Sequence, residues 1–176
     1  DFDAGALGAA TGTLLLTGLA AQVQAREAVL GRAAREDELE PLTWQAVRLG
    51  QSVSGVAYAS QFARINTEVR RIGRWFETVD VLVTPTIASP PVALGTLSTQ
   101  THTLDSFQQA MSAFCPFTGA FNATGQPAIS LPLHWTADGL PLGVQFVGRF
   151  GEDAALLQLA ADLERAQPWF PRPAPL

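Results

Sequence analysis

A short segment in the C-terminal half places small and polar side chains where a substrate pocket could form. Five such residues lie close together, four of them at spacings of three, four and three: Ser112, Cys115, Gly119 and Asn122, with Thr118 between them. If the segment is one continuous helix, this spacing puts the four on one side, unlike a plain apolar core stripe. Pro116 opposes that interpretation, because proline ends or kinks a helix. The residues alone leave open whether the segment lines a pocket or packs as ordinary structure.

Few other groups in the chain are suited to catalysis. Cys115 is the only cysteine, so it has no partner for an internal disulfide, and its neighbours lack the Cys/His spacing of a metal site. No histidine or helix end is recognisably placed to activate it, so we interpret it as a small buried side chain. His102 and His134 have no carboxylate at a spacing that indicates a dyad. We therefore expect no catalytic residue, no metal and no cofactor in these residues.

Composition and charge limit the class of protein. The chain has 176 residues, of which 47% are hydrophobic, and this length suits one ordinary domain with its own core. Its net charge is −5, and it has no basic stripe that would neutralise a phosphate backbone, so we expect no nucleic-acid partner. All eleven basic residues are arginines. A mechanism that uses a lysine must take that lysine from outside these residues.

The first residue and one apolar stretch indicate whether the sequence is part of a longer protein and whether it enters a membrane. The sequence begins at Asp1 and its only methionine is Met111, so we expect it to be a piece of a longer protein. Residues 6–23 are apolar but contain glycines and threonines, and no basic residue precedes them. We expect a helix packed against other protein there, not a membrane span or a signal sequence. Taken together with the single cysteine, this favours a cytoplasmic protein that does not bind membranes.

Hydrophobic periodicity predicts helices separated by short strands, as in an α/β layer fold. The long helix carries an apolar stripe that includes Val56, Phe62, Ile65 and Ile72, and Ser52 or Ser54 precedes it as a cap. A buried strand follows, and the best hairpin signal is a strand pair around Asp138-Gly139. Predicted helices cover about residues 11–35, 41–50, 54–78, 104–114, 116–122 and 151–165, and predicted strands cover about 81–83, 127–134 and 142–147.

Three consecutive passages resemble motifs of the amidase-signature enzymes. They are FETVDVLVTPT at residues 76–86, PFTGAFNATGQPAISLP at residues 116–132, and DGLPLGVQFVG at residues 138–148. Their order and separation also fit that family. The resemblance implies an α/β/α sandwich around a mixed β-sheet, incomplete in this chain, and it implies that Ser112, Cys115, Thr118, Gly119 and Asn122 line part of the acyl pocket.

The resemblance also implies a Ser-Ser-Lys mechanism for hydrolysing linear or cyclic carboxamides. Its parts are a serine nucleophile, a second serine and a lysine that move the proton, and backbone donors for the oxyanion. This chain has no lysine and no matching Gly/Ser-rich run. We therefore expect residues 1–176 to be the C-terminal portion of a single amidase-signature domain, inactive alone, with the upstream catalytic portion of the same enzyme as its partner. A non-catalytic amidase-like subunit or scaffold, as in a tRNA-dependent amidotransferase, is the alternative, and homo-oligomerisation is left open.

Overall fold

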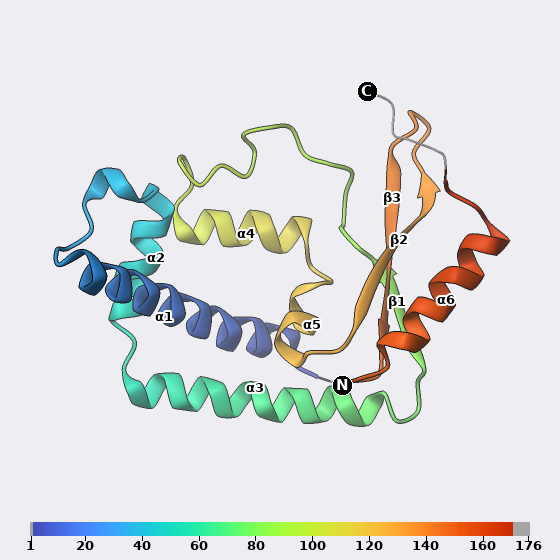
Figure 1. Ribbon diagram of the computed structural model, residues 1–176, viewed down its shortest axis with the longest axis horizontal. Helices are drawn as coiled ribbons and strands as arrows, with labels where there is room; N and C mark the ends of the chain where they lie inside the picture. The colour runs from blue at the N-terminus through green and yellow to red at the C-terminus, as the bar shows by residue number, and fades with distance from the viewer. Residues whose placement is uncertain (1, 171–176) are drawn as a thin grey trace. The chain divides into compact units, whose positions relative to one another are not determined.

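The computed structural model describes residues 2–170, which divide into two compact units. The helical unit comprises residues 3–68 and 92–113. The sheet unit comprises residues 69–91 and 114–170, together with Phe2. Figure 1 shows the elements of both units, coloured from blue at the N-terminus to red at the C-terminus.

The helical unit is built on two packed helices, α1 (Ala4–Leu30) and α2 (Pro41–Gln51). A short 3-10 turn, Glu36–Glu38, lies between them, and α4 (Leu104–Phe114) belongs to the same unit. The backbone N–H of Leu104 donates to Oε1 of Gln45 at 3.0 Å, which ties the start of α4 to α2. The predictions for α2 and α4 are confirmed.

Helix α1 begins earlier and ends earlier than its apolar pattern predicts. The side chain of Asp3 accepts a hydrogen bond from the N–H of Ala6 at 2.8 Å, which caps the first turn. Gly31 ends the helix with a φ of 65°, a left-handed conformation that glycine adopts without strain. By length and composition α1 could cross a bilayer, a test that buried helices of soluble proteins also pass.

Helix α3 (Gly55–Trp75) starts in the helical unit and ends in the sheet unit. The Oγ of Ser54 accepts from the N–H of Ala57 at 3.1 Å, so Ser54 serves as the predicted cap. The predicted apolar stripe is only partly buried: Ile65 and Ile72 are in the core, whereas Val56 and Phe62 are 79% and 52% exposed. The first turns of the stripe are therefore at least half exposed.

The sheet unit contains three antiparallel strands in the order β1-β3-β2, with β1 at Val81–Pro85, β2 at Ala128–Trp135 and β3 at Pro141–Gly148. The predicted hairpin is β2 and β3, and its turn contains Gly139 at a φ of 87°. The first strand was expected to be buried, but Val83 is 55% exposed. In the described sheet β1 is an edge strand, which explains this difference.

One face of this sheet packs against α6 (Asp153–Ala166), as Figure 1 shows. Leu131, Phe146 and Leu156 form the centre of the core between them. Because successive side chains of a strand alternate between faces, the residues next to Leu131 and Phe146 point to the opposite face. That opposite face is where the polar side chains of the sheet collect.

Candidate substrate pocket

The sheet face away from α6 carries a row of polar side chains. Thr84, Gln145 and Ser130 are directly opposite one another on the three strands, so they share this face. The Nε2 of Gln145 donates to Oγ1 of Thr84 at 2.9 Å, which fixes the orientation of a side chain that is only 5% exposed. Polar groups on an inner sheet face need such partners, because an unpaired buried amide would cost stability.

A second polar feature lies beside this row. The Oγ1 of Thr86 and the Oγ of Ser130 are 2.6 Å apart and hydrogen-bonded, although the two residues lie on the two sides of the central strand. Gly143 lies between them on β3. A Cβ added at Gly143 would lie 2.8 Å from the Thr86 oxygen and 2.7 Å from the Ser130 oxygen. The hydroxyl pair therefore depends on glycine at that position.

Thr86, Ser130 and Gln145 border a cavity of about 370 Å³ in the sheet unit. Its wall is completed by α5 (Gly119–Thr124) and by the turn that follows this helix. The polar side chains in the lining are hydroxyls and carboxamides, and none carries a charge: Thr86, Thr118, Asn122, Gln126, Ser130 and Gln145. Phe121, Ala128 and Ile129 provide the apolar part. Such a cavity suits a small neutral molecule with hydrogen-bonding groups.

The structure brings two of the five predicted pocket residues to this cavity, Thr118 and Asn122. Cys115 and Gly119 belong to the same unit but are outside the lining, and Cys115 is partly buried. Ser112 lies in the helical unit, on a separate cavity with Asp105, Gln108 and Gln109.

The idea that four of these residues share one helix face is wrong. Helix α4 ends at Phe114 and α5 begins only at Gly119, so Cys115 lies between two helices. Pro116 accounts for the break, because it lacks the N–H that a continuing helix needs and its ring clashes with the preceding turn. The predicted helix from Pro116 is accordingly shorter and starts later than expected.

Four polar residues of the lining were not predicted as site residues: Thr86, Gln126, Ser130 and Gln145. The sequence contains a signal for two of them, since Ser130 and Gln145 each lie in a strand between two apolar neighbours. What the sequence does not contain is the strand register, which places Ser130 opposite Gln145.

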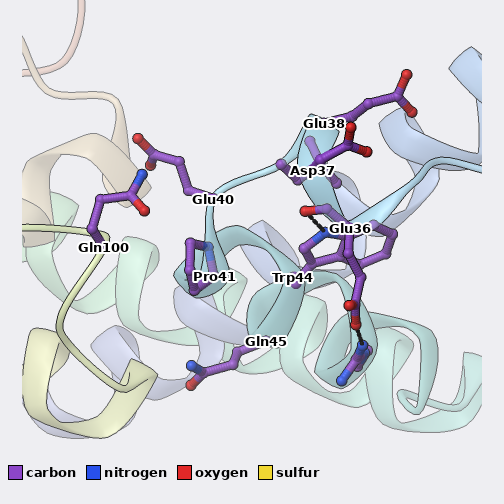
Figure 2. Close-up of a pocket in the computed structure, with 10 residues that line it drawn as sticks. Glu36, Asp37, Glu38, Glu40, Pro41, Trp44, Gln45 and Gln100 are labelled. Atoms are coloured by element: carbon purple, nitrogen blue, oxygen red, sulfur yellow. Dashed lines mark hydrogen bonds and ion pairs between the residues drawn. The ribbon is translucent and has the colours of Figure 1, made fainter.

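The helical unit has a larger cavity of about 690 Å³, shown in Figure 2, whose lining includes four acidic residues and Trp44. Three of these carboxylates pair with arginines: Glu36 with Arg48 at 3.3 Å, Asp37 with Arg35 at 3.4 Å, and Glu38 with Arg32 at 2.6 Å. The Arg32 hydrogen bond, reinforced by the N–H of Arg35, lowers the pKa of Glu38 to about 2. We interpret these pairs as bracing the connection between α1 and α2.

Comparison with known proteins establishes the family. The amidase family model matches residues 4–157, so this chain belongs to the amidase family. A 6-aminohexanoate-cyclic-dimer hydrolase of Paenarthrobacter ureafaciens is 34% identical over 166 residues, which cover 91% of this chain and 34% of the relative. The chain thus spans about a third of the length of the curated relatives it matches.

Solved structures agree with this assignment. A structure of 6-aminohexanoate cyclic dimer hydrolase matches with a TM-score of 0.85 and 33% identity, covering 95% of this chain and 36% of that one. A bacterial aryl acylamidase of the amidase signature family matches with a TM-score of 0.76 at 21% identity, covering all of this chain and 38% of that one. At this identity the match supports a shared fold and nothing about activity. The resemblance to amidase-signature enzymes and the partial α/β fold are confirmed.

Proposed function

We propose that this chain is the C-terminal portion of a single amidase-signature domain that hydrolyses carboxamides, and that the Ser-Ser-Lys residues lie outside these 176 residues. The absence of lysine from the sequence supports this proposal. Arginine does not substitute, because its guanidinium stays protonated and so accepts no proton from a serine. The matched relatives, which are about three times longer, leave room for the catalytic residues elsewhere.

In this proposal the chain supplies part of the scaffold and one wall of the acyl pocket. The observation that carries it is the uncharged cavity on the sheet, where Thr118 and Asn122 meet the polar side chains of the strands. Ser112, Cys115 and Gly119 remain proposed pocket residues of the intact protein. A linear or cyclic amide is the proposed substrate, and the cyclic-dimer hydrolase among the relatives favours a cyclic one. No cofactor is required for acyl transfer to serine.

Exposed apolar side chains on the helical unit support the proposal that another part of the protein packs against it. Leu15 on α1 and Val56 and Phe62 on α3 are 68%, 79% and 52% exposed. Apolar side chains exposed on helices can mark an interface with another part of a protein. We propose that the catalytic portion of the same enzyme covers them, and that the protein is cytoplasmic and binds neither membranes nor nucleic acid.

The isolated chain is expected to release no 4-nitroaniline from 4-nitroacetanilide above the rate in buffer. A hydroxyl or thiol without a base to activate it is a weak nucleophile towards an amide. Hydrolysis is followed by absorbance, with the Cys115→Ala variant measured in parallel. Turnover by the chain that this substitution abolishes would overturn both the proposal and the interpretation of Cys115 as an inert side chain. If the natural polypeptide hydrolyses no amide but purifies with a lysine-containing amidase-like partner, the non-catalytic subunit is the better description.

A further inference from the structure

The hydroxyl pair of Thr86 and Ser130 is an unusual arrangement for a three-stranded sheet. Neighbouring strands lie about 4.8 Å apart, so residues on the two outer strands are normally about twice that distance apart and separated by a central side chain. Here the N–H of Thr86 donates to the carbonyl of Gly143 at 3.0 Å, which continues the pairing beyond β1. With no side chain at Gly143, the two hydroxyls reach across β3 and meet.

The pair retains hydrogen-bonding capacity that its own bond does not use. Either hydroxyl can donate in the 2.6 Å contact, and whichever donates, the proton of the other is not consumed by that bond. The lone pairs of both oxygens can accept further bonds. Since both residues line the cavity together with Asn122, the cavity wall offers donors and acceptors at one place.

The same wall offers no charge. The lining contains no acidic or basic side chain, so an ionised group of a ligand would find no counter-ion there. A neutral group that both donates and accepts, such as a carboxamide, fits this environment, whereas a carboxylate or an ammonium group does not.

We propose that Thr86 and Ser130 determine substrate specificity by hydrogen-bonding a neutral polar group in the acyl part of the substrate, such as a second carboxamide. This inference rests on the proposed amidase function and names the kind of substrate that the pocket accepts. Gly143 is a positioning residue, because it acts only by allowing the two hydroxyls to meet.

The test compares two anilide substrates of equal acyl length in the natural polypeptide that carries these residues. One has a 6-acetamidohexanoyl group and the other a nonanoyl group, so they differ only in the internal amide. Losing one neutral hydrogen bond is expected to lower kcat/KM for the acetamido substrate about three- to tenfold in Thr86→Val and in Ser130→Ala. The value for the nonanoyl substrate is expected to stay the same. Ser89→Ala is the matched control, since its exposed hydroxyl bonds the carbonyl of Pro90, away from the cavity.

Gly143→Ala gives an independent variant, because its methyl group would displace both hydroxyls while leaving their chemistry intact. It is expected to lower the ratio of kcat/KM for the acetamido substrate to kcat/KM for the nonanoyl substrate, as Thr86→Val and Ser130→Ala do. An unchanged ratio, or an equal fall for both substrates, would show that the pair only stabilises the fold and would overturn the inference.

If the natural polypeptide hydrolyses neither anilide, binding decides the inference; the proposed function fails if it hydrolyses no cyclic amide either. An NMR titration with N-methylacetamide is expected to shift the backbone amide signals of Thr86 and Ser130, and Gly143→Ala is expected to abolish those shifts. Absence of the shifts in the unsubstituted protein would overturn the inference on its own.

Discussion

Replacing Phe146 by alanine is expected to lower the free energy of unfolding by about 3–5 kcal/mol. Phe146 lies on the central strand, is only 7% exposed, and packs in the core that Leu131 and Leu156 also form. Truncation removes the transfer free energy of the ring and leaves a cavity between the sheet and α6. Urea denaturation followed by circular dichroism measures the loss.

Phe150→Ala provides a control of the same chemistry, because Phe150 is 75% exposed. Its effect is expected to stay within about 0.5 kcal/mol. Equal losses in the two variants would contradict the assignment of the core to the face between the strands and α6.

Gly50→Ala is expected to destabilise the helical unit by about 3 kcal/mol, even though alanine is the better helix former. A Cβ at Gly50 would lie 2.1 Å from the carbonyl oxygen of Leu16 and 2.6 Å from its carbon. Both are backbone atoms of α1, so no rotamer change relieves the clash, and α1 and α2 must separate.

The matched control is Gly18→Ala, in the interior of α1, where an added Cβ meets nothing within 4 Å. This substitution is expected to stabilise the protein by about 0.5–1 kcal/mol, because alanine loses less backbone entropy in a helix. Thermal denaturation of both variants gives the comparison. A midpoint for Gly50→Ala at or above that of the unsubstituted protein would contradict the close packing of α1 on α2.

Local patterns were enough to predict most of the elements. The helix over residues 104–114 and the strands around Asp138-Gly139 follow from periodicity and turn residues, and both are present in the structure. The errors arise where one residue outweighs the pattern. Asp3 extends α1 by capping it, and α5 begins at Gly119 rather than at Pro116.

The candidate pocket was predicted only in part, for a different physical reason. Thr118 and Asn122 belong to a segment that resembles a known motif, whereas Thr86 and Ser130 are 44 residues apart and meet only through strand pairing. Their contact depends on the register of both outer strands against β3 and on the missing side chain at Gly143. Neither outer strand, considered alone, contains that information.

Labelling of the reactive serine tests the central proposal most directly. A fluorophosphonate probe forms a covalent bond with a serine that a catalytic base has activated, and mass spectrometry of the digested natural polypeptide then identifies the labelled residue. We expect the labelled serine to lie in the same polypeptide but outside these 176 residues, and an amide substrate to protect it; labelling only in a separate co-purified protein would favour the non-catalytic subunit instead. Specific, substrate-protected labelling of a serine within these residues, such as Ser112 or Ser130, would contradict the proposal that this portion carries no catalytic residue.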